Sequence, residues 1–342
     1  MKKLRPKVYV YGAGALVAVI AILLYYFFFT SFSGKTETAY LYIDADDTRD
    51  SVIVKLQDIG KKHSITGFST LSRHWNYDGD KIRTGRYAIE PGISTFSLFR
   101  HIKNGMQSPV NLTIPESRTT ERLAGSLAHK LMLDSAETAD LLADSSFCAK
   151  YGYDTAGVMA LFIPDTYEVY WNISIDKLME KMVKSHDRFW NEERTRKAEA
   201  MGMTPNEVAT LASIIDEETA NNGEKPMIAG MYYNRLKAEM PLQADPTVKF
   251  ALKDFALRRI YNKLLSTDSP YNTYKNTGLP PGPIKIASIA GIDAVLNHVN
   301  HDYLYMCAKE DFSGTHNFAV TYAEHLRNAA KYTKALNERG IK

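Results

Sequence analysis

The sequence has little cysteine and no excess of charge. Its 342 residues include two cysteines, Cys148 and Cys307, which are too few for a disulfide framework and lack the C-x-x-C spacing of zinc and thiol-exchange sites. Lysine and arginine number 42 against 39 aspartates and glutamates, and four of the basic residues lie before residue 8. The remainder is therefore close to neutral. Because binding to a phosphate backbone needs a basic surface, we expect no nucleic-acid partner.

Long apolar runs are equally scarce, since the sequence has one and no low-complexity tract or repeat follows it. The run VYVYGAGALVAVIAILLYYFFF covers residues 8–29 without a charge. As a helix it is long enough to cross a hydrocarbon core of about 30 Å. We therefore predict a single transmembrane helix over residues 8–29.

Charges on the two sides of this run predict its orientation. Cations precede it and acids follow it, at Lys2, Lys3, Arg5 and Lys7 and at Glu37, Asp44, Asp46 and Asp47. By the positive-inside rule, residues 1–7 form a cytoplasmic tail and the rest of the chain lies outside the cytoplasm. A cleaved signal peptide is the alternative, since Ser31 and Ser33 form a small-x-small pair, but signal-peptide apolar cores are only about 7–15 residues long.

Residues 38–110 have the pattern of a small α+β module. Two β-prone runs, AYLYI (39–43) and GRYAI (85–89), alternate with amphipathic helical segments. The apolar positions that share a helical face are Val52, Leu56 and Ile59 in one segment and Leu98 and Ile102 in another. The predicted order is strand, helix, helix, strand, helix.

Residues 111–342 have the pattern of a larger, mixed α+β domain. NLTIP (111–115) predicts a strand, and helices dominate from Arg118 to Met203. The segment ALFIPDTYEVYW (160–171) interrupts them, because its Pro-Asp pair breaks a helix. Its aromatic residues indicate a buried corner or a cleft wall, and simple core packing explains them equally well.

The segment MTPNEVATLASIIDEETANN (203–222) has the strongest helix-start signal in the sequence. Thr204 can cap the helix, Pro205 suits its first position, and Glu207 completes a T-x-x-E capping box. Asn221, Asn222 and Gly223 are expected to end it. The residues that share the face expected to be buried are Val208, Leu211, Ala212, Ile215 and Thr219.

Three consecutive acids close this helix, and its geometry separates them. At about 100° per residue, Glu217 points away from the apolar face, Asp216 lies on the polar border, and Glu218 projects between Leu211 and Ile214. Desolvation, repulsion by the two neighbouring acids and the negative end of the helix dipole should all raise the pKa of Glu218. A carboxyl group that stays protonated near neutral pH can act as a general acid. The alternative is a solvated acidic turn.

Several ordered blocks of the sequence resemble the endolytic murein transglycosylase family, also called MltG or YceG-like. The main blocks are LFIPDTY (161–167), TLASIIDEETA (210–220), YYNRLKAEMPLQADPTV (232–248), SPYNTYKNTGLPPGPI (269–284) and HNFAVTYAEH (316–325). IPES (114–117) and IRTGRYAIEPG (82–92) also look like that family. The resemblance covers the whole extracytoplasmic part of the chain and keeps the order and spacing of the blocks.

The resemblance implies a fold and a location. Residues 38–110 would form a LysM-like subdomain and residues 111–342 a YceG-like catalytic domain. The protein would be anchored in a bacterial inner membrane, with its catalytic domain in the periplasm. Its partners would be peptidoglycan glycan strands and cell-wall synthesis complexes.

The resemblance also implies an activity without a cofactor. The enzyme would cut nascent glycan strands internally between N-acetylmuramic acid and N-acetylglucosamine, leave 1,6-anhydro ends and so terminate strand elongation. The family's catalytic glutamate, the second acid of an E-x-E triplet, falls on Glu218. At the first acid this sequence has Asp216, one methylene shorter, which argues against a direct role for that residue.

One carboxyl group is sufficient for such a reaction. Glycoside hydrolysis normally requires two carboxylates. In a lytic transglycosylase the nucleophile is the C6 hydroxyl of the substrate, so ring closure is intramolecular and gains from proximity. We expect Glu218 to protonate the glycosidic oxygen and then to take the C6 hydroxyl proton, with the 2-acetamido group of the substrate as a second aid at the anomeric carbon.

The other blocks supply candidates for substrate binding. These are Gln243, Asp245 and Thr247 in a polar turn, Tyr271, Asn272 and Tyr274 before a proline-rich loop, and His316 and Asn317 near the C-terminus. A purely structural turn or loop is the alternative for the first two groups. His316, Glu324 and His325 match no zinc motif, so we predict no metal site.

Two other functions remain open. A membrane-tethered peptidoglycan-binding scaffold would need only the LysM-like module and would leave the acidic turn inert. A hydrolytic muramidase would need a second positioned carboxylate, for which Asp245 is the candidate.

Overall fold

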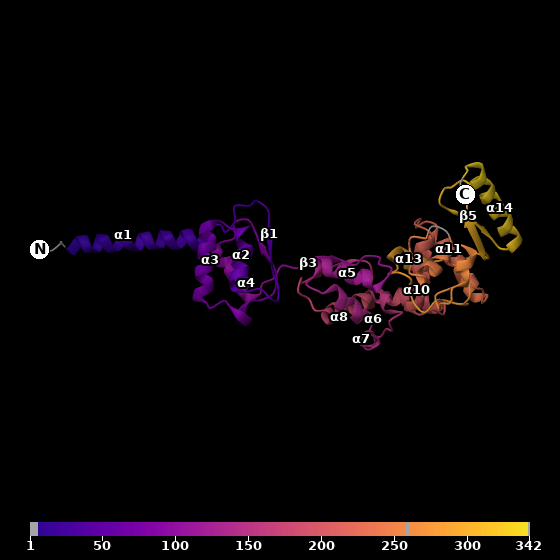
Figure 1. The fold of residues 1–342 in the computed structure, drawn as a ribbon, viewed down its shortest axis with the longest axis horizontal. Coiled ribbons are helices and arrows are strands. Elements are labelled where there is room, and N and C mark those ends of the chain that lie inside the picture. The colour runs from indigo at the N-terminus through magenta and orange to yellow at the C-terminus, as the bar shows by residue number, and fades with distance from the viewer. Residues whose placement is uncertain (1–5, 258–259, 341–342) are drawn as a thin grey trace. The chain divides into compact units, whose positions relative to one another are not determined.

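The computed structural model describes residues 6–257 and 260–340, so residues 1–5 of the expected cytoplasmic tail lie outside the described residues. The chain divides into two compact units. The first holds the residues up to 111 together with 130–132 and 168–173, and the second holds 112–129, 133–167 and 174–342. Each unit combines helices with a small two-stranded sheet (Figure 1), which confirms the predicted α+β class.

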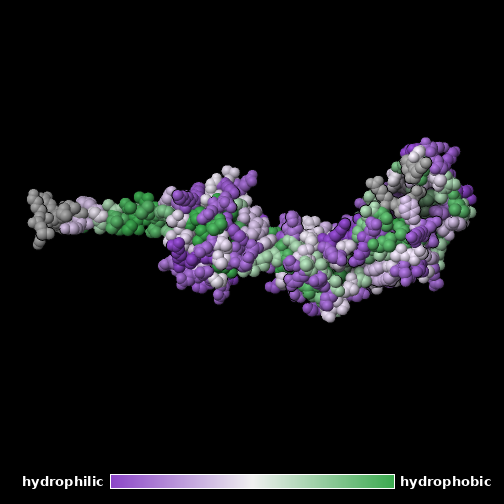
Figure 2. All heavy atoms as spheres, viewed as in Figure 1, coloured by the Kyte–Doolittle hydropathy of each residue, from purple (hydrophilic) through white to green (hydrophobic). Residues whose placement is uncertain are grey.

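The first unit begins with an apolar helix. Helix α1 (Pro6–Leu24) continues into a π-helical turn, η1 (Tyr25–Phe29). The stretch Tyr9–Phe29 is 21 residues long, apolar and not buried by the rest of the protein. Figure 2 shows hydrophobic residues over the part of α1 that precedes the first module. Its length and composition are therefore compatible with a single membrane span.

The module after this helix has the predicted order of elements. They are β1 (Ala39–Ile43), α2 (Arg49–Gln57), α3 (Lys62–His74), a 3₁₀ turn η2 (Gly79–Lys81), β2 (Gly85–Ile89) and α4 (Thr95–Asn104). Strands β1 and β2 pair antiparallel with Leu41 opposite Tyr87, and both side chains are buried. Val52, Leu56 and Leu98 lie on the predicted apolar faces of α2 and α4. All three are fully buried in the core of the module. The likeness of this module to LysM stays a prediction.

The second unit is mostly helical. Its elements and those at its boundary are β3 (Val110–Thr113), α5 (Thr120–Lys130), α6 (Ser135–Ala143), α7 (Ser145–Ala149), η3 (Val158–Leu161), β4 (Thr166–Val169), α8 (Ile175–Phe189), α9 (Glu192–Ala200), α10 (Pro205–Glu218), α11 (Lys225–Lys237), α12 (Asp245–Ala251), η4 (Asn262–Ser266), α13 (Ile289–Leu296), β5 (Tyr305–Ala308), β6 (His316–Ala319) and α14 (Tyr322–Glu338). β3 pairs with β4, and β5 pairs antiparallel with β6.

Helix α10 is the centre of the second unit's core. It begins as predicted, with a Thr204–Glu207 capping box and Pro205 in the first turn. Every residue from Val208 to Ile215 is buried, because α9, α11, α12, α13 and η3 all contact this helix. The amphipathic pattern predicted one buried face, whereas the packing covers the whole circumference.

The predicted end of this helix is wrong by four residues. α10 ends at Glu218, and Thr219 is extended (φ −145°, ψ 138°) and buried. The Thr219 hydroxyl accepts a hydrogen bond from the Asn221 N–H, and such a local bond competes with the helical pattern. The early end places Glu218 in the last helical position, where the chain turns away from the core.

The aromatic segment 160–171 is buried at its start, whereas Tyr170 near its end is exposed. Phe162 and Tyr167 are buried, and the Tyr167 hydroxyl donates to the Ile163 carbonyl at 2.9 Å. Neither residue reaches the pocket described below. Core packing therefore explains these two aromatics.

Candidate active site

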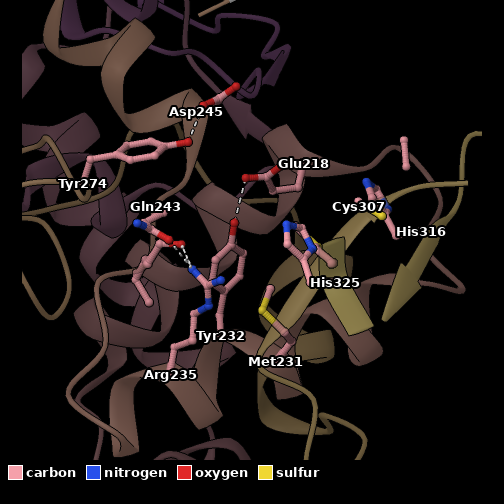
Figure 3. Close-up of a pocket in the computed structure, with 13 residues that line it drawn as sticks. Glu218, Met231, Tyr232, Arg235, Gln243, Asp245, Tyr274, Cys307, His316 and His325 are labelled. Atoms are coloured by element: carbon pink, nitrogen blue, oxygen red, sulfur yellow. Dashed lines mark hydrogen bonds between the residues drawn. The ribbon is translucent and has the colours of Figure 1, made fainter. Parts of the chain in front are cut away.

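A polar pocket of about 310 Å³ lies at the end of α10 in the second unit (Figure 3). Glu218 enters it from α10, Tyr232 and Arg235 from α11, and Tyr274 from the loop before α13. The other residues that line it are Met231, Leu242, Gln243, Asp245, Met306, Cys307, Ala308, His316 and His325. Residues as far apart in the sequence as 218 and 325 thus line the pocket that the Glu218 carboxyl group enters.

The Glu218 carboxyl group is held by a single tyrosine hydroxyl. Tyr232 donates a hydrogen bond of 2.7 Å to Glu218 Oε1 (Figure 3). Burial raises the pKa of Glu218 above its ordinary value of 4.5, and the negative charge of Asp245 adds to this. The Tyr232 hydrogen bond and the charge of His316 act in the opposite direction. The predicted direction of the shift and its main cause, desolvation, are confirmed.

The expected repulsion by the two neighbouring acids is not a cause of this shift, because both are ion-paired. Asp216 lies 2.7 Å from Lys225 Nζ, and both side chains are almost fully buried, with exposures of 2% and 7%. Glu217, which was predicted to point away from the apolar face, binds Arg118 through both oxygens at 2.7 and 3.2 Å. Cations from other segments neutralise these two acids and leave Asp245 as the negative charge that acts on Glu218.

Asp216 also joins α10 to α13. Its carboxylate accepts hydrogen bonds from the Ser288 N–H at 2.6 Å and the Ser288 hydroxyl at 2.8 Å. A Cβ at Gly291 would lie 2.6 Å from Asp216 Oδ1, so the glycine is what permits this close approach. Asp216 is therefore a structural residue that fits a narrow space between α10 and α13.

Three of the predicted substrate-binding residues, Gln243, Asp245 and Tyr274, line the same pocket. The Tyr274 hydroxyl donates to Asp245 at 2.6 Å (Figure 3). Gln243 has a left-handed backbone (φ 52°), and its N–H donates to the Thr273 carbonyl. Arg235 donates to the carbonyls of Pro241 and Leu242 and so fixes the loop that carries Gln243.

A carboxylate orients the histidine at the other side of the pocket. Glu224 is buried, accepts the backbone N–H of His316 at 2.6 Å and lies 3.0 Å from His316 Nδ1. This contact places an Nδ1 proton between the imidazole and the Glu224 carboxylate and so fixes the orientation of the ring. A second histidine, His325, lies stacked on Tyr305, and burial lowers its pKa, which favours a neutral imidazole.

Four predicted site residues lie outside the pocket. Thr247 and Asn272 are fully buried, and their side chains bind the Thr273 hydroxyl and the carbonyls of Leu265 and Thr267, respectively. Tyr271 packs on Phe250, with ring centroids 4.7 Å apart, and Asn317 donates to Glu310. Thr247 and Asn272 thus brace the loops that present Gln243 and Tyr274.

The sequence interpretation missed Tyr232, Arg235, His325 and Glu224. Tyr232 and Arg235 are three residues apart on α11, so a helical reading of YYNRLK would have placed them on one face. Nothing local indicated that this face meets the end of α10. The free thiol of Cys307 also lines the pocket, and burial raises its pKa, which makes it a poor nucleophile.

Comparison with known proteins agrees with this architecture. The model of the YceG-like family matches residues 41–331. The chain belongs to the YceG-like family. The endolytic murein transglycosylase of Bacillus subtilis strain 168 is 31% identical over 312 residues, which cover 84% of each protein.

Two further relatives extend the YceG-like comparison. The endolytic murein transglycosylase of Streptococcus pneumoniae strain D39 is 28% identical, and the match covers 80% of this chain but only 54% of the pneumococcal protein. The crystal structure of a YceG-like protein from Listeria monocytogenes superposes with a TM-score of 0.57 at 28% identity, covering 86% of this chain and 99% of that one. The family resemblance expected from the sequence is confirmed.

The Glu218–Tyr232 contact of this YceG-like protein leads to a prediction about pH. Since the Tyr232 hydroxyl favours the charged carboxylate, Tyr232→Phe should raise the pKa of Glu218 further. If activity needs the protonated carboxyl group, the alkaline limb of kcat/KM should move to higher pH, which a pH–rate profile measures. Tyr233→Phe is the control, because that hydroxyl donates to the Met201 carbonyl instead. An unmoved alkaline limb in Tyr232→Phe would show that another group sets it.

Proposed function

We propose that this protein is an endolytic lytic transglycosylase that cuts peptidoglycan glycan strands between N-acetylmuramic acid and N-acetylglucosamine. The observation that carries the proposal is the half-buried Glu218 carboxyl group, whose pKa is raised by desolvation and which opens into a polar pocket. Relatives named endolytic murein transglycosylases match most of the chain and support the same substrate class. A carboxyl group with a raised pKa is the kind of proton donor that this reaction requires.

Glu218 would act first as an acid and then as a base. Its proton passes to the glycosidic oxygen as the bond from that oxygen to the muramic C1 breaks. The C6 hydroxyl of the same sugar attacks C1, and the Glu218 carboxylate takes the hydroxyl proton as the new C1–O6 bond forms. The proton count balances and no water enters, so the product carries a 1,6-anhydro end.

The pocket supplies further groups for holding the sugar. Gln243, Asp245, Tyr274 and His316 line it together with Glu218, and each can donate or accept a hydrogen bond to a hydroxyl or acetamido group. Glu224 fixes the imidazole plane of His316, so that residue is already oriented before substrate binds. Asn317 and Tyr271 would act at most through their neighbours.

The membrane location belongs to the same proposal. Phe32, between the serines that form the small-x-small pair, is fully buried in the core of the first module. Cleavage there would remove a core residue, which favours a retained span over a signal peptide. We propose a single span in a bacterial inner membrane, a cytoplasmic N-terminus, a periplasmic site, contact with cell-wall synthesis complexes and a role in terminating strand elongation.

A hydrolytic muramidase is the second candidate, because one observation favours it. Asp245 lines the same pocket as Glu218 and provides the second carboxylate that hydrolysis requires. Its hydrogen bond from Tyr274 holds it in place but also occupies one of its oxygens. The two reactions differ in the mass of the product by one water.

Mass spectrometry of the products from purified glycan strands tests the proposal. The wild-type protein should release fragments with anhydro ends, and Asp245→Asn should slow the reaction without changing the kind of end. Reducing ends with one added water, abolished by Asp245→Asn, would instead establish a muramidase. Binding of the strands without any cleavage would favour the scaffold.

A further inference from the structure

The first module is joined to the apolar helix without a flexible linker. Phe32 lies three residues after η1 and is fully buried in the module's core. Its N–H donates to the Ile93 carbonyl at 2.7 Å, and its carbonyl accepts from the Lys61 N–H at 2.9 Å. The module therefore begins where the apolar helix ends, and its position at that end is fixed by backbone hydrogen bonds.

Helix α3 packs directly on the end of the apolar helix. A Cβ at Gly67 would lie 2.3 Å from the Phe27 carbonyl oxygen, so only glycine permits this contact. The His63 ring stacks on Tyr26 with centroids 4.2 Å apart, and its Nε2 lies 3.0 Å from the Thr30 hydroxyl. These contacts hold α3 next to the point at which a membrane span would leave the hydrocarbon.

A patch of exposed and half-buried aromatic rings continues from this point to α4 and to the end of α3. Phe29 is 54% exposed and lies 5.8 Å from the ring of Phe96, which in turn lies 6.3 Å from Trp75, 39% exposed. The guanidinium of Arg100 lies 6.0 Å from the centre of Phe96, and Lys103 Nζ lies 5.6 Å from that of Trp75. Aromatic rings next to cations are typical of side chains at a membrane interface.

The acidic residues of the first module lie outside helices α3 and α4. Helices α3 and α4 contain the cations Lys62, Arg73, Arg100 and Lys103 and no aspartate or glutamate. The acids of residues 38–110 all lie on other segments, at Asp44, Asp46, Asp47, Asp50, Asp58, Asp78, Asp80 and Glu90. The two helices that contact η1 are thus the ones that anionic headgroups would attract.

We propose that α3 and α4 form a lipid-binding face, defined by Phe29, Trp75, Phe96, Arg100 and Lys103, that docks on anionic phospholipid headgroups of the leaflet in which α1 ends. This inference rests on the proposal that α1 crosses a membrane. It adds a second contact with the membrane, which the first module itself makes. Because the patch is continuous with the end of the proposed span, we expect it to bind the lipid surface and not another protein. Docking would hold the first module against the membrane rather than free above it.

The test uses the full-length protein in lipid nanodiscs with phosphatidylcholine brominated near the headgroup. Quenching of Trp75 is read as the difference between wild-type fluorescence and that of Trp75→Phe, so the other tryptophans stay unchanged. We expect quenching, about twofold stronger when phosphatidylglycerol is added. Arg100→Glu with Lys103→Glu should abolish the increase, and Arg100→Gln with Lys103→Gln should reduce it.

The matched control reverses two exposed cations of α8, in Lys177→Glu with Lys184→Glu, and should retain the increase. Trp75 fluorescence that bromine does not quench, in protein that co-elutes with the discs, would overturn the docking proposal and leave the span intact. Quenching that is the same with and without phosphatidylglycerol would overturn the anionic specificity. Protein that fails to co-elute with the discs would overturn both the span and the docking, whereas the glycan-cleavage assay would still test the proposed enzyme independently.

Discussion

Glu218→Gln should lower kcat on glycan strands by about 10²–10⁴-fold, which is the usual contribution of a general acid–base group. Glutamine keeps the shape of a protonated glutamate and can still accept the Tyr232 hydrogen bond, but it cannot donate a proton to the leaving oxygen. KM should change little, because the side chain's volume and contacts are retained. Release of anhydro-ended fragments from purified strands measures the loss.

The same substitution should make the folded protein more stable at neutral pH. Burial raises the folded-state pKa of Glu218 above its ordinary 4.5, so the folded state holds this proton more tightly than the unfolded chain does. The stability that comes from this proton is complete below the unfolded pKa and is lost as pH rises through the folded pKa. Glutamine does not titrate, so the advantage of Glu218→Gln should grow with pH above about 4.5 in urea unfolding experiments.

Glu217→Gln is the matched control on the adjacent acid. It weakens the ion pair with Arg118 and so should lower stability, while kcat stays close to that of wild type. Glu218→Gln is thus expected to lower activity and raise stability, whereas Glu217→Gln should lower stability and leave activity nearly unchanged. Wild-type kcat in Glu218→Gln would mean that the proton donor is another group in the pocket.

Sequence patterns correctly predicted those parts of the fold that are determined by residues close together in the sequence. The start of α10 depends on Thr204, Pro205 and Glu207, which act within four residues of each other, and the structure has all three in the predicted roles. The order of elements in the first module follows from the alternation of β-prone runs with helical periodicity, and it too is confirmed.

The site itself depends on contacts between distant segments, which periodicity does not reveal. Tyr232 meets Glu218 because α11 packs against α10, and Ser288 meets Asp216 across 72 positions of the sequence. The helical wheel separated Glu218 from Glu217, but it could not show that Arg118 binds Glu217. The positions of cations from other segments therefore decide which two of the three acids are ion-paired.

Lys225→Met should lower the free energy of unfolding by about 3–5 kcal/mol, the largest stability effect that we expect in the second unit. The Lys225 ammonium and the Asp216 carboxylate are 2.7 Å apart and nearly inaccessible to water. Methionine fills a similar volume but leaves Asp216 with only the two hydrogen bonds from Ser288. A buried carboxylate without a cation lowers the free energy of unfolding far more than the loss of a surface ion pair does. Urea unfolding of the detergent-solubilised chain measures this difference.

An exposed ion pair with a similar N–O distance serves as the comparison for the effect of burial on stability. Lys197 and Glu193 on α9 are 2.8 Å apart but 34% and 65% exposed, so Lys197→Met should cost only about 0.2–1 kcal/mol. Adding Asp216→Asn to Lys225→Met should recover much of the loss, because it removes the unpaired charge and keeps a polar side chain next to Ser288. If Lys225→Met costs no more than Lys197→Met, the Asp216 carboxylate is already neutral in the folded protein and the ion pair does not form in solution.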